Sequence, residues 1–239
     1  MIAYMFAVLL AGAGVFGADN CYNDVTLDCS QASTSLILPS CNAIFGGYGH
    51  HGNLATEMQA YANLHLKKSY EYLLSSAYYD NYQTNRAGFT KLFRKLSDHT
   101  WEKTIELIKH INLRGGVMDF QRRSVLETQP ENNYTVELHE LESLAKALDS
   151  EKELAERAFF IHREATRNSQ HLHDAGILCT ISGLYIAQYL EEEFIEYQSK
   201  NVRDLAGYTS DLKKFVTDNN GQDLSLALYI FDEYLKKVV

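Results

Sequence analysis

Apolar side chains recur every three or four residues over four long stretches of the chain, which is the spacing of one helix face. The first stretch runs from about Asn53, a plausible N-cap, to about Tyr79, and the second from about Arg86 to Leu113. The third covers about Val136 to Thr166, and the fourth about His171 to Ala206. A short fifth stretch follows at Leu224 to Leu235. The pattern therefore predicts four long helices and one short helix.

The connections between these stretches predict how the helices are arranged. The only two prolines, Pro39 and Pro130, lie outside all five stretches, so each stretch can form a continuous helix. Short connections join the first stretch to the second and the third to the fourth, which makes each pair an antiparallel hairpin. A segment without periodicity, Arg114 to Thr135, separates the second from the third and can run the length of a bundle. We expect an all-α four-helix bundle with one long crossover loop and a short fifth C-terminal helix.

The N-terminal segment predicts export from the cytosol. Residues 1–17 contain no charged side chain, are almost wholly apolar and end in small residues, which is typical of a cleaved signal peptide. The segment is too short to span a bilayer comfortably. The formal net charge of -9 argues against binding to nucleic acid, because no basic stripe is present to neutralise phosphates. We therefore expect a secreted protein, in the lumen of the secretory pathway or in extracellular fluid.

Residues 18–47 form an N-terminal extension that contains three of the four cysteines, Cys21, Cys29 and Cys41. In an oxidising compartment such a cluster indicates disulfide bonds, and no Cys-x-x-Cys pattern supports a zinc site. Three cysteines cannot all pair with one another, so one of them pairs with the distant Cys179 or with another subunit. Asn133 begins an Asn-Tyr-Thr sequon in a polar loop and is the candidate glycosylation site.

Five segments, in order along the chain, resemble the motifs of ferritins. They are Asn63–Leu73 (NLHLKKSYEYL), Arg114-Gly115-Gly116, Ala147-Leu148 with Glu151-Lys152, Tyr189–Glu193 (YLEEE) and Tyr229–Asp232 (YIFD). The resemblance covers roughly residues 48–239, and the signal peptide with its cysteine-bearing extension is similar to the secreted ferritins of insects. It implies a ferritin-like four-helix bundle that stores iron as a ferric mineral core. It also implies assembly with a heavy-chain subunit into a shell of roughly two dozen chains.

The residues that a ferritin uses to oxidise iron are largely replaced in this sequence. A di-iron centre in this fold takes single Glu residues and a Glu-x-x-His pair, and the chain contains no Glu-x-x-His. The resemblance assigns six residues to the ferroxidase-centre positions: His65, Tyr72, Thr100, Lys103, Glu151 and Glu193. Thr100 is a poor ligand, and the Lys103 cation repels ferrous iron. We therefore expect a vestigial centre, no tightly bound di-iron and a subunit that is not an enzyme.

Two further expectations concern charged side chains on the second helix. A buried carboxylate needs a partner, so we expect Lys103 to pair with Glu151 and fill the vacated site; the alternative is that Lys103 reaches out to solvent. Four residues on one face of this helix are candidates for ferric mineral nucleation, a role that ferritins give to acidic residues on the same helix. They are Asp98, His99, Glu102 and Glu106. The alternative for this face is an ordinary solvated surface.

Two other functions are compatible with parts of the pattern. The first is a ferroxidase with an altered di-iron centre built from His65, Tyr72, Glu151 and Glu193, although Lys103 would lie close to the metal. The second is a secreted helical signalling protein, which accounts for the signal peptide and disulfides but not for the five motifs or the single crossover.

Overall fold

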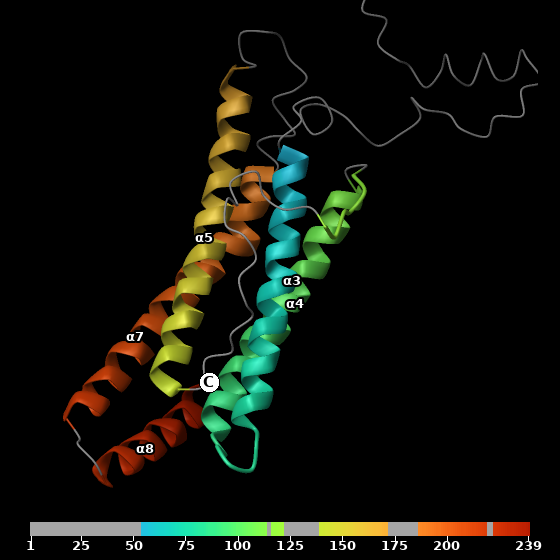
Figure 1. Ribbon diagram of the computed structural model, residues 1–239. Helices are drawn as coiled ribbons and strands as arrows, with labels where there is room; N and C mark the ends of the chain where they lie inside the picture. The colour runs from blue at the N-terminus through green and yellow to red at the C-terminus, as the bar shows by residue number, and fades with distance from the viewer. Residues whose placement is uncertain (1–53, 114–115, 122–138, 172–185, 219–221) are drawn as a thin grey trace, which may run out of the picture. The chain divides into compact units, whose positions relative to one another are not determined.

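The computed structural model describes residues 54–113, 116–121, 139–171, 186–218 and 222–239. In this part of the chain the secondary structure is helical, as Figure 1 shows. The elements are α3 (Leu54–Tyr79), α4 (Ala87–Leu113), α5 (Glu140–His171), the π-helical turn η1 (Glu191–Ile195), α7 (Glu196–Asp218) and α8 (Gln222–Val238). Residues 186–190 are also α-helical and lead directly into η1, so 186–218 is one helix with a π-turn inside it. The expected all-α fold is confirmed.

A tight turn makes α3 and α4 an antiparallel hairpin (Figure 1). Asn85 has a φ of 46°, a conformation that asparagine tolerates better than most residues. Its backbone N–H donates to the Asn81 carbonyl at 2.8 Å, and the N–H of Arg86 donates to the Tyr79 carbonyl at 3.0 Å. At the other end of α4, the N–H of Gly116 donates to the Ile111 carbonyl at 3.0 Å, the six-to-one bond of a Schellman motif.

Side chains of α4 and α8 bind backbone groups at the ends of the other helix. The Asp232 carboxylate on α8 accepts the backbone N–H groups of Gly88 and Phe89 at 2.9 and 3.0 Å, two donors that a helix start leaves unpaired. In return Lys91 on α4 donates to the Lys236 carbonyl at 3.1 Å, in the last turn of α8. Gly88 is required at this contact, because a Cβ there would clash with the backbone carbonyl oxygen of Asp232. The C-terminal helix therefore caps the second long helix.

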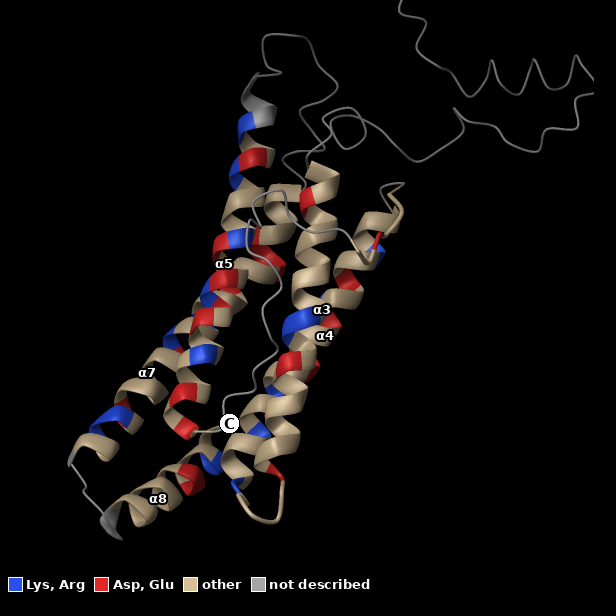
Figure 2. Ribbon diagram, in the orientation of Figure 1, with Lys and Arg blue, Asp and Glu red and all other residues tan. Residues whose placement is uncertain are grey.

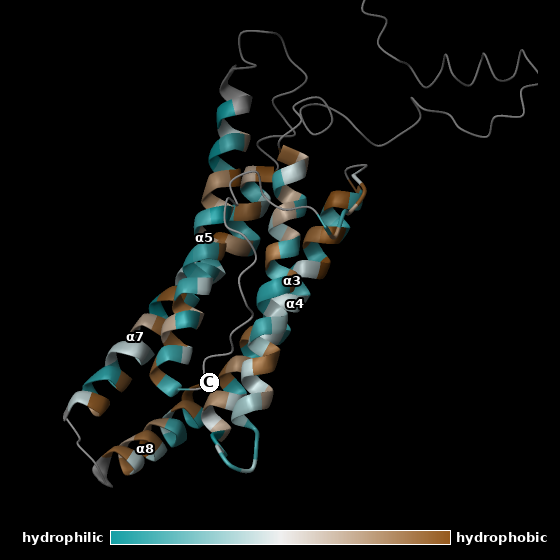
Figure 3. Ribbon diagram, viewed as in Figure 1, coloured by the Kyte–Doolittle hydropathy of each residue, from teal (hydrophilic) through white to brown (hydrophobic). Residues whose placement is uncertain are grey.

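The apolar core of the bundle is divided by a layer of polar side chains. One buried apolar cluster includes Met58, Leu107 and Leu154, and a second includes Phe93 and Leu144. Each of the four long helices contributes buried polar residues between the two clusters: His65, Lys68, Ser69, Ser97, Thr100, Thr104, Ser150, Glu151 and Gln198. Hydrophilic and hydrophobic residues accordingly alternate along every long helix in Figure 3. The polar layer is the natural place to look for a functional site.

Several predicted helix boundaries are wrong. The third helix begins at Glu140 and continues to His171, so it does not end near Thr166 and the fourth helix does not begin at His171. The fourth helix runs on to Asp218 and does not stop near Ala206. The helix continues through Gly207, and no atom lies within 4 Å of where a Cβ at this position would be. The lower helix propensity of glycine is therefore the only cost there, and it is modest. Burial of Leu212 against the second apolar cluster stabilises the extra turns.

Positively and negatively charged residues are interspersed along the described helices (Figure 2). Arg157 on α5 forms an ion pair with Glu57 on α3 at 3.4 Å, and Arg86, in the turn before α4, pairs with Glu140 on α5 at 3.0 Å. Among the described residues no helix is long and apolar enough to cross a membrane.

Candidate functional site

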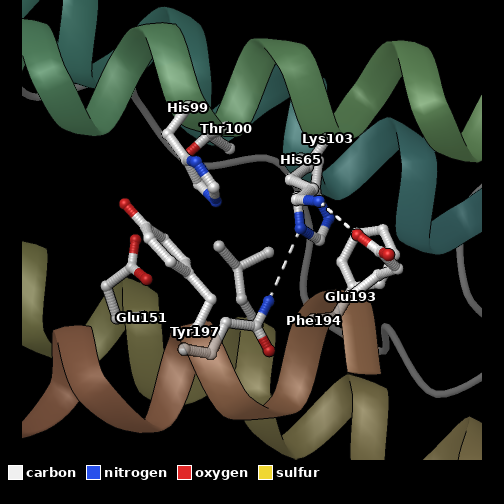
Figure 4. A pocket seen from close by; sticks show the side chains of 10 residues that line it. His65, His99, Thr100, Lys103, Glu151, Glu193, Phe194 and Tyr197 are labelled. Carbon is white, nitrogen blue, oxygen red and sulfur yellow. Dashed lines mark hydrogen bonds and ion pairs between the residues drawn. The ribbon is translucent and has the colours of Figure 1, made fainter. Parts of the chain in front are cut away.

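The polar layer encloses a narrow pocket to which all four long helices contribute. Its free volume is about 10 Å³, close to the smallest space that holds one water molecule. Figure 4 shows side chains from α3, α4, α5 and the fourth helix converging on it. The pocket is lined by His65, His99, Thr100, Lys103, Glu151, Leu154, Glu193, Phe194, Tyr197 and Gln198. Five of the six residues expected at the vestigial ferroxidase positions thus lie around one pocket, and the sixth, Tyr72, contacts Glu151 from α3.

His65 is held as a neutral imidazole. Its Nδ1 lies 3.1 Å from the Tyr61 carbonyl oxygen and must donate to it, which leaves Nε2 as an acceptor. The Gln198 amide nitrogen lies 3.5 Å from that Nε2 and donates to the Tyr61 hydroxyl at 2.8 Å. Burial, partly offset by the Tyr61 hydrogen bond, lowers the pKa of His65 to about 4. The nearby Lys103 charge acts in the same direction.

His99 enters the pocket from α4, and its ring stacks on Tyr197 with centroids 3.5 Å apart. Burial and the Lys103 charge lower the pKa of His99 to about 4, so it too is neutral at physiological pH. Its Nε2 is buried without a protein partner. His99 therefore presents an uncharged, polar edge to the pocket rather than a cation.

Lys103 provides the positive charge of the site. Its ammonium lies 2.7 Å from a Glu106 carboxylate oxygen and 2.9 Å from a Glu193 oxygen (Figure 4 shows the second contact). It also lies 5.5 Å from the centre of the Phe194 ring, within the range of a cation–π contact. Desolvation acts to lower the pKa of Lys103, but the bonds to both carboxylates outweigh it and raise that pKa. The ammonium is therefore a fixed charge.

The expected pairing of Lys103 with Glu151 is wrong. Glu151 is buried, and its two carboxylate oxygens accept hydrogen bonds from the Tyr72 hydroxyl at 2.9 Å and the Asn201 amide at 3.2 Å. Both partners are neutral, so burial dominates and raises the pKa of Glu151. Lys103 instead forms ion pairs with two carboxylates that are nearer to solvent, and one of them, Glu106, lies one turn away on the same helix.

The π-turn η1 brings two residues of the fourth helix into the site. Leu190, Phe194 and Gln198 are all buried although they are spaced four residues apart, a spacing that drifts by about 40° per step in an α-helix. The π-turn has more residues per turn and offsets this drift between Leu190 and Phe194. Phe194 thereby packs in the core while Glu193 reaches Lys103.

The pocket, with these partners, is poorly suited to bind a divalent cation. Thr100 donates its hydroxyl to the Leu96 carbonyl at 2.7 Å, both oxygens of Glu151 have partners, and Glu193 is paired with the ammonium. Within the described ranges, no group of three or more His, Cys, Asp or Glu side chains is arranged to hold a metal ion. The arrangement stabilises an internal positive charge supplied by the chain itself.

The four candidate nucleation residues fall into two places. Asp98, His99 and Glu102 line an open groove of about 630 Å³ along α4, where Lys91 and Arg94 also lie. Arg94 forms an exposed ion pair with Asp98 at 2.9 Å. Glu106 does not line this groove, and its carboxylate is bound to Lys103. The structure therefore groups three of the four residues at one solvent-open surface.

Some expected residues lie outside the described part of the chain, and some pocket residues were not expected. Cys21, Cys29, Cys41 and Asn133 belong to the first group, as do the signal peptide and the extension. Phe194 and Gln198 belong to the second, and Asn201, which donates to Glu151 from outside the pocket lining, was not expected either. The sequence does contain one sign of a pocket here: the polar residue Gln198 follows the apolar Phe194 by four residues on a stripe that is otherwise apolar.

Comparisons with known proteins agree with this architecture. A family model described as a ferritin-like domain matches residues 56–215. The ferritin light chain of Trichoplusia ni is 64% identical over 239 residues, which cover 100% of this chain and 99% of that relative. The ferritin light chain of Drosophila melanogaster is 39% identical over 234 residues, covering 98% and 96%. The crystal structure of Trichoplusia ni secreted ferritin superposes with a TM-score of 0.80 at 66% identity, covering 93% of this chain and 100% of that one.

Proposed function

Because the chain belongs to the ferritin family, we propose that it is a non-catalytic, light-chain-type subunit of a secreted iron-storage shell. In this role it forms part of the wall of the shell, stabilises the shell and nucleates the mineral, while a heavy-chain subunit oxidises Fe(II). The names of its similar relatives, two ferritin light chains and a secreted ferritin, support the proposal. The apolar N-terminal segment is consistent with the secreted location.

One observation carries the non-catalytic part of the proposal: the Lys103 ammonium lies in the pocket between Glu106 and Glu193. A fixed cation at this point repels Fe(II), and it engages a carboxylate that could otherwise bind the metal. The neighbouring Thr100 hydroxyl is already bonded to the backbone, and His65 faces the Gln198 amide. The site is thus organised around an internal cation in place of two irons.

The mineral-nucleation part rests on the α4 groove. Asp98 and Glu102 are exposed carboxylates four residues apart, and hard oxygen ligands of this kind suit ferric ions. His99 lies at the inner edge of the same groove. Asp98 and Glu106 each have an ion-pair partner, Arg94 and Lys103, that an incoming ferric ion would have to displace, and Glu106 also lies outside the groove.

The experiment that tests the proposal is Fe(II) oxidation, followed by absorbance, on assembled particles with and without the heavy subunit. Particles must first be shown to assemble, because an unassembled chain would be inactive for an unrelated reason. We expect this chain alone to oxidise iron no faster than buffer, and mixed particles to oxidise it rapidly. Replacing Asp98 and Glu102 by Asn and Gln should then slow mineral growth in mixed particles without slowing oxidation.

The alternative is a ferroxidase with an altered centre built from His65, Tyr72, Glu151 and Glu193. It requires Lys103 to leave its two carboxylates and Glu151 to exchange its neutral partners for a metal. Rapid oxidation by particles of this chain alone would establish it and overturn the non-catalytic proposal. A signalling role is not retained, because the ferritin-like domain extends over residues 56–215.

A further inference from the structure

The groove along α4 separates its positive charges from its negative ones. Three cations, Lys91, Arg94 and Lys95, lie within little more than one turn of the helix, and the carboxylates Asp98 and Glu102 follow in the next two turns. At 1.5 Å per residue, Lys91 and Lys95 are about 6 Å apart along the helix axis, and Arg94 lies between them. All five residues line one open volume of about 630 Å³. The groove therefore has a cationic end beside the carboxylates that we propose to nucleate mineral.

The three cations have partners that bind them only weakly. Lys91 donates to the backbone carbonyl of Lys236 at 3.1 Å, which is an uncharged acceptor. Lys95 donates to an oxygen of the last residue of the chain at 3.5 Å, a long distance for a hydrogen bond. Arg94 pairs with Asp98 at 2.9 Å, but both side chains are more than half exposed, and exposed ion pairs are weak. A multiply charged anion can therefore offer each cation a stronger partner.

We propose that Lys91, Arg94 and Lys95 bind a tetrahedral oxyanion of the inorganic phosphate type, and that Arg94 leaves Asp98 to do so. The planar guanidinium of Arg94 can donate two parallel hydrogen bonds to the oxyanion, while the two ammonium groups act as point charges. Asp98 then has no ion-pair partner and is open, together with Glu102, to a ferric ion. The oxyanion thus converts Asp98 from a paired carboxylate into an available ligand, and no covalent bond changes.

The spacing of the cations favours a small anion, and two other groups in the groove limit its affinity. Because the three cations span about one helical turn, a single tetrahedral ion can contact all of them. The groove also contains the Asp80 carboxylate, which repels an anion, and Val239, whose oxygen competes for Lys95. We therefore expect a modest affinity that falls as the salt concentration rises.

The use of this site rests on the proposed function, because the release of Asp98 matters only if the groove nucleates mineral. In that case the oxyanion regulates nucleation by controlling how many carboxylates of the groove are available to iron. The oxyanion site itself needs no iron. Its test can therefore fail while the iron-storage proposal stands, or succeed while that proposal falls.

The test measures the binding of radiolabelled inorganic phosphate to assembled, iron-free particles by equilibrium dialysis, at constant ionic strength in chloride. We expect saturable binding to a single class of site. Arg94→Gln should weaken this binding about tenfold, the effect of losing one charged hydrogen-bond donor, and Lys95→Gln should weaken it similarly. The matched control is Lys109→Gln, which removes the same charge from an exposed position of α4 outside the groove and should leave the affinity nearly unchanged.

A second pair of variants tests whether Arg94 leaves Asp98. Asp98→Asn removes the ion pair that the oxyanion has to break, so we expect it to tighten phosphate binding about fivefold, the upper range for an exposed pair. Glu102→Gln removes the same charge from the same groove, four residues further along α4, and should tighten binding less.

Only particles of normal size and melting temperature are compared. The oxyanion site is overturned if phosphate shows no saturable binding to the parent particle, or if Arg94→Gln and Lys109→Gln weaken binding equally. Equal gains in Asp98→Asn and Glu102→Gln would overturn the release of Asp98, because the gain would then come from net charge alone.

Discussion

Glu151 makes the stability of the bundle depend on pH in a direction opposite to that of most carboxylates. Burial, opposed by bonds from Tyr72 and Asn201, raises its pKa in the folded state above the ordinary value of the unfolded chain. The folded state therefore holds its proton longer, and stability falls as pH rises through the window between the two values. Glu151→Gln mimics the protonated form, so we expect it to remove this fall and to raise the melting temperature at neutral pH.

Thermal melts of the particle at several pH values check this prediction. Glu153→Gln on the same helix is the control, because that side chain is 48% exposed and bonds to Lys68 instead. If the Glu151→Gln particle is less stable at every pH, the ionised carboxylate stabilises the fold and the prediction is wrong.

Lys103→Met tests the charge in the pocket while keeping most of the side-chain volume. The partners Glu106 and Glu193 are about half exposed, so the loss should be on the order of 1 kcal/mol, not the several kcal/mol of a buried pair. Chemical denaturation of the particle at neutral and acidic pH measures it, and the loss should shrink as the carboxylates are protonated. Lys109→Met, an exposed residue of α4, is the control. A loss of several kcal/mol would indicate a buried ion pair instead.

The sequence predicted which residues surround the pocket better than it predicted their partners. Helical spacing alone places His65 and Tyr72 on one face, and the ferritin resemblance brings Lys103 and Glu151 to the same level of the bundle. Partner choice depends on side-chain reach within a few ångströms, which spacing does not specify. The i, i+3 relation of Lys103 and Glu106 was nevertheless visible in the sequence and favoured the observed pair.

At the scale of elements, periodicity predicted α3 and α4 to within a residue or two, because strong turn and glycine signals bound them. The end of the fourth helix was missed because Gly207 reads as a stop signal, although packing carries the helix through it. The π-turn was also missed. The only sign of it in the sequence is the four-residue spacing of Leu190, Phe194 and Gln198. The same spacing also fits an ordinary α-helix with a broad buried face, so it does not by itself predict a π-turn.

The contact between α4 and α8 predicts the effect of a single carboxylate. Asp232→Ala removes the acceptor for two backbone N–H groups at the start of α4, and we expect a loss of about 2 kcal/mol, the upper range for a helix cap. Asp232→Asn keeps an oxygen acceptor and should lose less. Equilibrium denaturation of the particle checks the order, and equal losses in the two variants would contradict capping. Glu233→Ala, the neighbouring residue on α8, is the control.

At the scale of the whole molecule, we expect the chain to assemble, and size-exclusion chromatography should show a particle of roughly two dozen chains. The extension cysteines Cys21, Cys29 and Cys41 offer a covalent link to a neighbouring subunit. Gels of the assembled particle without reductant should then show a band heavier than one chain that disappears with reductant. Only single-chain bands under both conditions would restrict the disulfides to pairs within one chain.

The capping of α4 by Asp232 has a consequence for biosynthesis. The residue that completes the start of α4 is made 144 positions after Gly88, so the first turn of α4 leaves the ribosome long before its partner exists. Until then the bundle carries two open backbone donors and an uncovered apolar seam around Phe89. A chain interrupted before its last helix would therefore expose two backbone donors and the Phe89 ring at the start of α4, a surface that a chaperone can recognise.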